Sequence, residues 1–130
     1  MDGPIHHVIG FDVAPEMIYD ELVRADNFAA WTDAPAEIDP TPGGAFSLFG
    51  GQIDGRNIEL VPGVRVVQAW RVAGWEAGQY SLTRFELRPE PPGTTLTFDH
   101  IGFPPEARQE LDGGWHAMYW EPMRRHLAPG

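Results

Sequence analysis

Between Gly43 and Arg71 the chain reads GGAFSLFGGQIDGRNIELVPGVRVVQAWR, and this stretch holds the clearest signs of its architecture. Short runs of β-forming residues are separated by turn residues, first at Gly50-Gly51 and later at Pro62-Gly63. The pair Asp54-Gly55 is a strong signal for a two-residue hairpin turn, so we expect the chain to reverse there. The spacing of these turns predicts a meander of short strands.

The meander continues toward the C-terminus. Strand-like runs cover residues 64–72, 79–88 and 94–101, and loops containing Gly or Pro separate them. Helical spacing then returns over residues 105–127. Within this last stretch we expect Gly113-Gly114 to interrupt the helix and Pro122 to kink it, because proline lacks the N–H that a helix interior requires.

The N-terminal side contributes one strand and two helices. Residues 7–13 alternate in the manner of a strand with one buried face. Residues 15–25 begin with proline and carry an apolar stripe, which predicts an amphipathic helix. Asp26 or Asn27 is a suitable cap for a second short helix that ends near Trp31. Residues 32–44 contain three prolines and two glycines and are expected to form a loop.

The order of these elements predicts the fold class. A strand, two short helices, a meander of strands and a long C-terminal helix indicate an α+β domain with its helices on one face of the sheet. We expect a curved antiparallel sheet of six or seven strands wrapped on the last helix. The 130 residues suffice for one ordinary domain, so residues 1–130 are predicted to fold as a single unit.

Composition excludes several classes of function. The chain has no Lys, nine basic residues against nineteen acidic ones and a formal net charge of −10, so nucleic acid and anionic membranes are poor partners. It contains no Cys, which excludes disulfides and thiolate chemistry. No signal peptide or membrane-spanning stretch is recognisable, and no membrane insertion is expected. The expected location is the cytoplasm.

Strand parity identifies the side chains that face the last helix. Alternate residues of a strand point to opposite sides, and the charged residues of each run fall on one side. The other side is apolar and aromatic, and we expect it to face inward; it comprises Val66, Gln68, Trp70, Thr83, Phe85, Leu87, Leu96, Phe98 and His100. Such a face suits either a ligand cavity with a few polar groups or a packed aromatic core.

Familiar catalytic and cofactor motifs are absent from the sequence. Neither serine lies in a nucleophile turn, no phosphate-binding loop is possible without Lys, and no dinucleotide fingerprint occurs. The five histidines lack metal-ligand spacing, so neither a metal nor a cofactor is expected. His100 is the one weak catalytic candidate, as an acid or base assisted by Tyr119 or Asp99. A histidine hydrogen-bonded within the core is the alternative for that position, and Gln68 has the same two interpretations.

The motifs along the chain resemble those of a known family. Glu59-Leu60-Val61-Pro62-Gly63, followed by Val67-Gln68-Ala69-Trp70-Arg71, is similar to bacterial members of the START-like family named after the activator of the heat-shock protein 90 ATPase. Further matching pieces cover nearly the whole chain, and they include Gly43-Gly44 with Phe46, Ala14-Pro15-Glu16, Thr94-Thr95-Leu96-Thr97, His100, and Gly114-Trp115. The resemblance implies a helix-grip fold (START-like, or SRPBCC, and similar to Bet v proteins) with a cavity between the sheet and the last helix.

Three hypotheses of function follow from the inward face and the resemblance. The first is a binding protein for a small hydrophobic or amphipathic molecule; its cavity would be lined by Trp31, Phe46, Gln68, Trp70, Thr83, Phe85, Phe98, His100, Trp115 and Tyr119. The second is a cyclase, dehydratase or hydrolase that uses the same cavity. The third is a chaperone-linked or stress-linked interaction module. A second copy of the chain, as a homodimer, is a further partner to be considered.

Overall fold

A computed structural model describes residues 3–128. The strands of this structure are β1 (Ile5–Phe11), β2 (Ala36–Ile38), β3 (Ala45–Leu48), β4 (Ile53–Val61), β5 (Arg65–Val72), β6 (Ser81–Glu90) and β7 (Gly93–Ile101). The helices are α1 (Pro15–Val23), α2 (Ala25–Thr32), α3 (Arg108–Trp115) and α4 (Glu121–Leu127). Shorter helical turns are η1 (Phe49–Gly51), η2 (Pro105–Ala107) and the π turn η3 (His116–Trp120).

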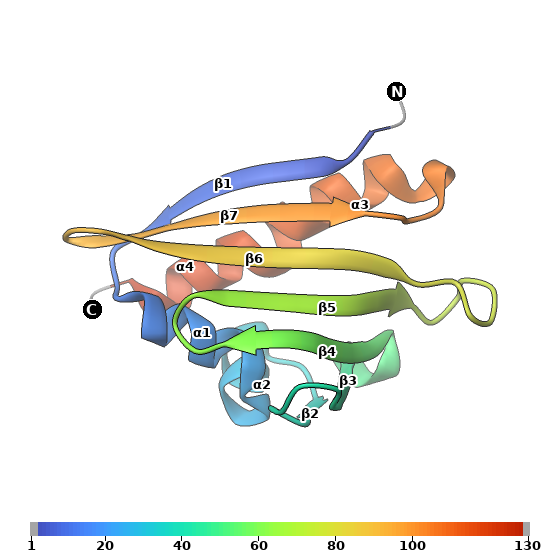
Figure 1. Ribbon diagram of the computed structural model, residues 1–130, viewed down its shortest axis with the longest axis horizontal. Coiled ribbons are helices and arrows are strands. Elements are labelled where there is room, and N and C mark those ends of the chain that lie inside the picture. Colours follow the sequence, from blue (N-terminus) through green and yellow to red (C-terminus); the bar gives the residue numbers. More distant parts are fainter. Residues whose placement is uncertain (1–2, 129–130) are drawn as a thin grey trace.

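The strands form one antiparallel sheet. Its order is β1-β7-β6-β5-β4-β3-β2, so every pair from β2 to β7 joins strands that are consecutive in the chain (Figure 1). The first strand closes the other edge by pairing with the last, with His7 opposite Phe98. This is the predicted meander, and the predicted fold class is confirmed.

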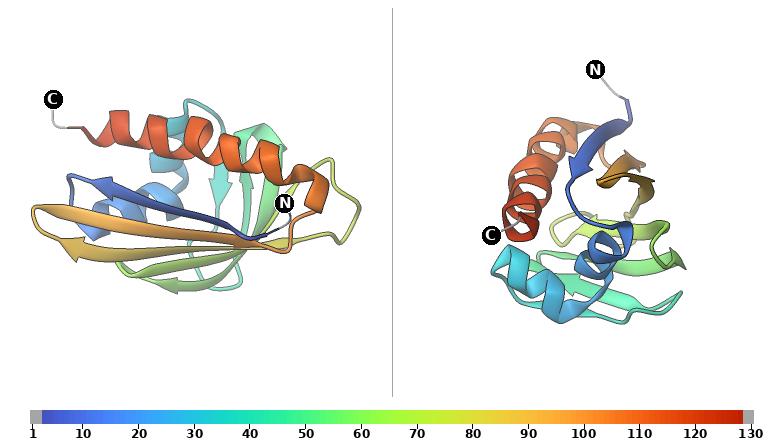
Figure 2. Two further views of the ribbon diagram at one scale, coloured as in Figure 1. Left: turned by 90° about the horizontal axis from the view of Figure 1, so that it is seen from above. Right: turned by 90° about the vertical axis from the view of Figure 1, so that its left-hand side faces the viewer.

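The C-terminal helix runs along the concave face of the curved sheet (Figure 2). It is built from α3, η3 and α4 in direct succession, so Gly113 and Gly114 lie inside a helix, and the predicted interruption there is wrong. Pro122 is the second residue of α4, one residue beyond Glu121, which follows the π turn. Proline has no N–H to donate inside this continuous helix, and it stands next to the π turn, where the regular hydrogen-bond pattern of the α-helix is already interrupted.

The strand region differs from the prediction at one turn. Asp54-Gly55 lies inside β4, and the chain reverses earlier, through the η1 turn in which Gly50 and Gly51 both have positive φ. The hairpin signal at Asp54-Gly55 is therefore wrong, because Gly55 serves a different need. A Cβ atom at Gly55 would lie 1.9 Å from the carbonyl oxygen of Ala69, so only glycine fits where these strands meet.

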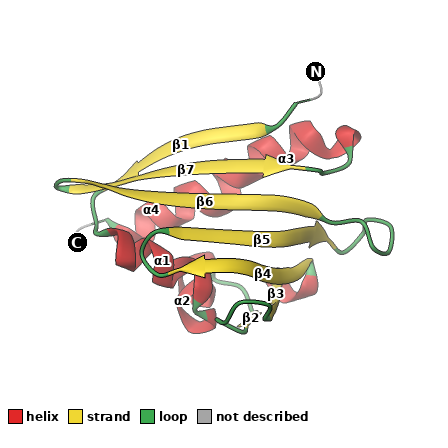
Figure 3. Cartoon of the chain, in the orientation of Figure 1, coloured by secondary structure: helices red, strands yellow, loops and turns green. Residues whose placement is uncertain are grey.

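The helices before the meander also differ in detail. Helix α1 begins with Pro15, as predicted, but α2 begins at Ala25 with Arg24 at its N-cap, so neither Asp26 nor Asn27 caps it. The segment expected to be a loop contains the three-residue edge strand β2, which pairs with β3 (Figure 3). Helix α2 contacts α4, while α1 contacts β5 and β6.

The core lies between the sheet and the last helix. Every residue of the inward face predicted by strand parity is buried, including the polar Gln68, Thr83 and His100. Aromatic rings fill the centre, where Phe98 and Trp115 lie with their ring centroids 4.3 Å apart. The buried aromatic side chains therefore belong to one continuous core. Within residues 3–128, none of the helices combines the length and the apolar character that a membrane crossing requires.

Candidate ligand pocket and the polar groups beneath it

An apolar pocket of about 230 Å³ opens between the C-terminal helix and the β4–β5 end of the sheet. Most of the side chains around it are apolar, and its only charged one is Glu110; the lining comprises Phe49, Gln52, Ile53, Trp70, Val72, Glu110, Leu111, Gly114, Trp115, Met118 and Tyr119. Its position is the one that the helix-grip arrangement implies, at the junction of helix and sheet.

Helix and strand periodicity bring these residues together. Leu111, Trp115 and Met118 lie at spacings of four and three along α3 and η3, so they share one helix face. Trp70 and Val72 alternate along the inward side of β5. Gly114 leaves the helix backbone bare at the pocket, and a Cβ atom placed there would meet no heavy atom within 4 Å. The pocket therefore extends up to the helix backbone itself.

Two polar groups in the pocket wall lack partners. The indole Nε1 of Trp70 and the hydroxyl of Tyr119 are both buried, and neither has a hydrogen-bond partner within residues 3–128. Burial raises the pKa of the Tyr119 hydroxyl well above its usual value, and the nearby Trp70 N–H opposes this only in part. The two groups are close, yet they do not meet in hydrogen-bond geometry. Unpaired buried polar groups are costly and uncommon in native structures.

His100 lies deeper, in a complete hydrogen-bond chain. Its Nδ1 accepts from the indole N–H of Trp115 at 3.0 Å, and its Nε2 donates to the hydroxyl of Ser81 at 2.7 Å. The Ser81 hydroxyl in turn donates to the carbonyl oxygen of Trp70 at 2.7 Å. Burial lowers the pKa of His100 to about 3, so the imidazole is neutral at ordinary pH.

The surroundings of His100 are those of a histidine packed in the core. Its side chain is fully buried, and both ring nitrogens are occupied by structural partners. Asp99 lies on the other side of the strand, where it pairs with His6 and Arg84, and the Tyr119 hydroxyl has no described hydrogen-bond partner. An acid or base at His100 would need an accessible imidazole with a carboxylate beside it. The described residues do not form that arrangement.

A second polar chain crosses the core at Gln68. Its amide nitrogen donates to the side-chain oxygen of Asn57 at 3.1 Å, and Asn57 donates to the carbonyl oxygen of Asp39 at 3.1 Å. The hydroxyl of Thr83 donates to Gln68 at 3.4 Å. Gln68 and Thr83 therefore hold strands β4, β5 and β6 to the loop that follows β2.

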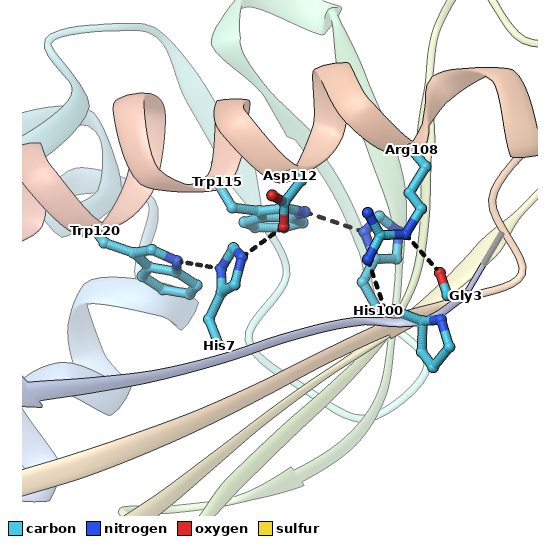
Figure 4. Close-up of polar contacts among 8 residues, drawn as sticks. Gly3, His7, His100, Arg108, Asp112, Trp115 and Trp120 are labelled. Atoms are coloured by element: carbon cyan, nitrogen blue, oxygen red, sulfur yellow. Dashed lines mark hydrogen bonds and ion pairs between the residues drawn. The ribbon is translucent and has the colours of Figure 1, made fainter. Parts of the chain in front are cut away.

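A third set of polar contacts fixes one side of the C-terminal helix to β1 (Figure 4). His7 points up from β1 between two helix residues: its Nε2 lies 2.8 Å from the carboxylate of Asp112, and its Nδ1 accepts from Trp120 at 2.9 Å. Arg108 donates to the carbonyl oxygens of Gly3 and Pro4 at 3.0 and 3.3 Å. The helix is therefore tied to the β1 edge, while the pocket opens at its other side.

The structure divides the residues predicted to line a cavity into two groups. Trp70, Trp115 and Tyr119 line the pocket. The others lie in the packed core and do not line it, and these are Trp31, Phe46, Gln68, Thr83, Phe85, Phe98 and His100. Trp31, for example, donates its indole N–H to the carbonyl oxygen of Glu21 at 2.8 Å.

Sequence reasoning missed the outer part of the pocket. Phe49 lies at the predicted Gly50-Gly51 turn but was not assigned to a cavity wall, and Leu111, Gly114 and Met118 lie in the helix that was expected to be broken. A continuous helical spacing across Gly113-Gly114 would have put these residues on one face. Ion-binding geometry offers no second candidate: residues 3–128 contain no group of three or more His, Asp or Glu side chains that could hold a metal ion.

Comparison with known proteins agrees with this architecture. Residues 12–128 match the model of the family described as "Activator of Hsp90 ATPase homolog 1-like protein". A relative from Dictyostelium discoideum, an activator of 90 kDa heat shock protein ATPase homolog, is 31% identical over 106 residues, which cover 81% of this chain and 28% of the relative. The chain spans about a third of the length of the curated relatives it matches.

Two solved structures share the fold at low identity. An HSP90 activator from Plasmodium falciparum superposes with a TM-score of 0.91 at 22% identity, over 95% of each chain. The solution structure of the Aha1 dimer from Colwellia psychrerythraea gives a TM-score of 0.82 at 20% identity, over 96% of each chain. The matched family covers nearly the whole described domain, and the chain belongs to the Activator of Hsp90 ATPase homolog 1-like family.

Proposed function

We propose that this protein binds a small hydrophobic molecule in the pocket between the C-terminal helix and strands β4 and β5. The observation that carries the proposal is the pocket itself, about 230 Å³ of mostly apolar lining at the helix–sheet junction. An apolar cavity of roughly 150 Å³ is enough to hold benzene. The pocket therefore suits a compact molecule of one ring rather than a long lipid. The proposed location of the protein is the cytoplasm.

The structure supports the proposal through the way the pocket is bounded. Its floor consists of closely packed rings, since the ring centroids of Trp70 and Trp115 are 5.1 Å apart and those of Trp115 and Tyr119 are 4.3 Å apart. Its outer wall includes Met118, whose side chain is half exposed and adaptable in shape. A closely packed floor with an adaptable wall is suited to small ligands of varied shape.

Two adjacent glycines in α3 allow a matched test. Gly114 lines the pocket and Gly113 does not, while a Cβ atom at either position would meet no heavy atom within 4 Å. Gly114→Leu is expected to fill the pocket and abolish the binding of ethylbenzene. The binding is measured by NMR titration. Gly113→Leu, with the same change in helix propensity, is expected to bind ethylbenzene as the unchanged chain does. Equal binding by both variants would place the ligand elsewhere.

A second candidate function is contact with a chaperone. Relatives of this chain are named activators of the 90 kDa heat shock protein ATPase, and the chain matches only part of their length. The side of the sheet away from the helix carries exposed apolar residues, where Leu82 and Ile101 are paired across β6 and β7 beside Tyr80. The test is a pull-down with the middle domain of Hsp90, compared with Leu82→Glu. Capture of the unchanged chain that Leu82→Glu abolishes would support this second function, and no capture of the unchanged chain would overturn it.

A further inference from the structure

The two unpaired polar groups in the pocket wall indicate what kind of molecule fits there. The indole N–H of Trp70 can only donate a hydrogen bond, and the hydroxyl of Tyr119 can donate one as well. Neither finds an acceptor within residues 3–128, although the two groups lie close together beside the pocket. A single oxygen atom with two lone pairs, placed between them, would satisfy both groups at once.

The charge around the pocket restricts the ligand further. No Arg or His lines it, and Glu110, which is exposed at the mouth, is its only charged residue. A carboxylate entering here would lose its hydration without meeting a cation and would approach a like charge. The pocket therefore disfavours anions such as fatty acids and aromatic acids, and it favours neutral molecules.

One part of the pocket wall next to these groups has a strained backbone. Phe49 has a φ of 54°, a left-handed conformation that is unfavourable for a phenylalanine, and it is followed by Gly50 and Gly51, which also have positive φ. Its ring lies 6.0 Å from that of Tyr119. Because the polar atoms of Trp70 and Tyr119 are covered, a ligand must displace a neighbouring side chain to reach them, and the ring of Phe49 is one neighbour of Tyr119 in the pocket wall.

The geometry points to a neutral one-ring ligand with a single accepting oxygen, such as an aromatic ketone, whose oxygen is held between the Trp70 N–H and the Tyr119 hydroxyl. This inference rests on the proposed function and narrows it. It predicts a preference that depends on one atom of the ligand. Ethylbenzene, acetophenone and benzoate form a matched series of similar size, which differ in having no acceptor, one neutral acceptor, or a charged acceptor.

The test measures the affinity of the three compounds by NMR titration. Acetophenone is expected to bind about 5- to 150-fold more tightly than ethylbenzene, because two hydrogen bonds of about 0.5–1.5 kcal/mol each contribute about 1–3 kcal/mol together. Benzoate is expected to bind more weakly than ethylbenzene. The indole N–H resonance of Trp70 should shift downfield with acetophenone and not with ethylbenzene, whereas that of Trp31, which is bonded to Glu21, should stay in place.

Variants that remove the polar atoms complete the test. Trp70→Phe and Tyr119→Phe each keep a ring but delete one donor, so each should lower the preference for acetophenone several-fold while ethylbenzene still binds. Tyr80→Phe, at an exposed tyrosine outside the pocket, is the control and should leave the preference unchanged. Ethylbenzene binding also reports that each variant is folded.

The outcomes separate the inference from the function on which it rests. Equal affinity for ethylbenzene and acetophenone would overturn the inference and leave the binding function intact. Tightest binding by benzoate would overturn the preference for neutral molecules. Failure of all three compounds to bind the unchanged chain would overturn the proposed function itself.

Discussion

Trp115 donates its indole N–H to Nδ1 of His100 across 3.0 Å, and this bond joins helix α3 to strand β7 through the middle of the core. Because Nδ1 accepts, the proton of the neutral imidazole resides on Nε2, which donates to Ser81. The tautomer is thereby fixed by structure. A histidine of this kind stabilises the fold only while it is uncharged.

The first prediction concerns acid stability. The pKa of His100 falls from 6.5 to about 3 on folding because the ring is buried. Between pH 6.5 and pH 3 the His100 side chain binds a proton in the unfolded chain but not in the folded chain. The contribution of His100 to the unfolding free energy is therefore fully present above pH 6.5, and it is lost as the pH falls toward 3. The contribution of one such group is about 1.4 kcal/mol of unfolding free energy per pH unit. Urea unfolding at several pH values measures this slope.

The controls for this prediction are substitutions at two histidines. His100→Gln should be less stable at pH 7 and should show a shallower fall in unfolding free energy between pH 6 and pH 4, in the range that the buried ring controls. His116→Gln, at an exposed histidine, should keep the slope of the unchanged chain. If both variants keep the same slope, the acid sensitivity arises elsewhere.

Strand periodicity predicted the core well for a physical reason. Side chains point alternately to the two sides of a strand. In residues 64–72 the charged side chains fall on one side, so Val66, Gln68 and Trp70 were predicted to face inward, and all three are buried. Turn chemistry was less reliable at Asp54-Gly55. A glycine is required both where a chain turns and where two backbones approach closely, and local sequence does not distinguish these needs.

The second prediction follows from that close approach. Gly55→Ala would put a methyl group 1.9 Å from the carbonyl oxygen of Ala69 and 2.7 Å from the ring of Phe46. Strands β4 and β5 would have to separate, and we expect a loss of about 3 kcal/mol or more of unfolding free energy. Gly74→Ala is the matched control, since a Cβ atom there meets no heavy atom within 4 Å, and it should change stability by less than about 0.5 kcal/mol. Comparable effects in urea unfolding would contradict the packing argument.

The third prediction concerns the buried amide chain at Asn57. This side chain is fully buried, accepts from Gln68 and donates to the backbone of Asp39. Asn57→Ala leaves both partners unpaired, at a cost of about 2–4 kcal/mol in unfolding free energy. Gln79→Ala removes an exposed amide bond to Gly102, which water can replace, so it should cost less than about 1 kcal/mol. Thermal unfolding measures both losses. If the two variants lowered the unfolding temperature equally, burial would not determine how much stability is lost when an amide hydrogen bond is removed.

The candidate site was harder to predict than the fold. Trp70, Trp115 and Tyr119 were assigned to a cavity wall, and they line the pocket. The sequence does not indicate how completely side chains fill a concave sheet, because packing depends on rotamers and on the exact path of the last helix. It also gave no sign that Trp70 and Tyr119 would be left without partners, since hydrogen bonds between distant residues follow from the assembled structure alone.

The fourth prediction concerns Glu21, a buried carboxylate on α1. Burial is the largest influence and raises its pKa, against the opposing effects of Asn27 and His126. One carboxylate oxygen accepts from Asn27 at 3.2 Å, while the other has no hydrogen-bond partner among the described residues. Because the raised pKa means that the folded chain holds this proton more tightly, the carboxylate weakens the fold as the pH rises above 4.5.

Glu21→Gln should therefore stabilise the protein at pH 7, by about 1 kcal/mol, since the buried charge is removed. The advantage should shrink as the pH is lowered below 4.5, where the carboxyl of the unchanged chain is itself neutral. Glu16→Gln, at an exposed position of the same helix, is the control and should be nearly neutral at both pH values. A destabilised Glu21→Gln at pH 7 would mean that the contact with His126, at 3.7 Å, outweighs burial.

The last prediction compares the two sides of the contact that ties the helix to β1. The carboxylate of Asp112 is 42% exposed and the His7 side chain only 9%, although they share one bond. In Asp112→Ala, water can accept from His7, so the cost should stay below about 1 kcal/mol. In His7→Phe the buried N–H of Trp120 loses its acceptor, and the cost should reach about 1–3 kcal/mol even though a ring of similar shape remains.

Urea unfolding of the two variants measures the difference in unfolding free energy. Glu106→Ala, at an exposed position just before α3, is the control. If Asp112→Ala cost as much as His7→Phe, the His7–Asp112 hydrogen bond rather than the covered indole bond would hold the helix to the sheet edge.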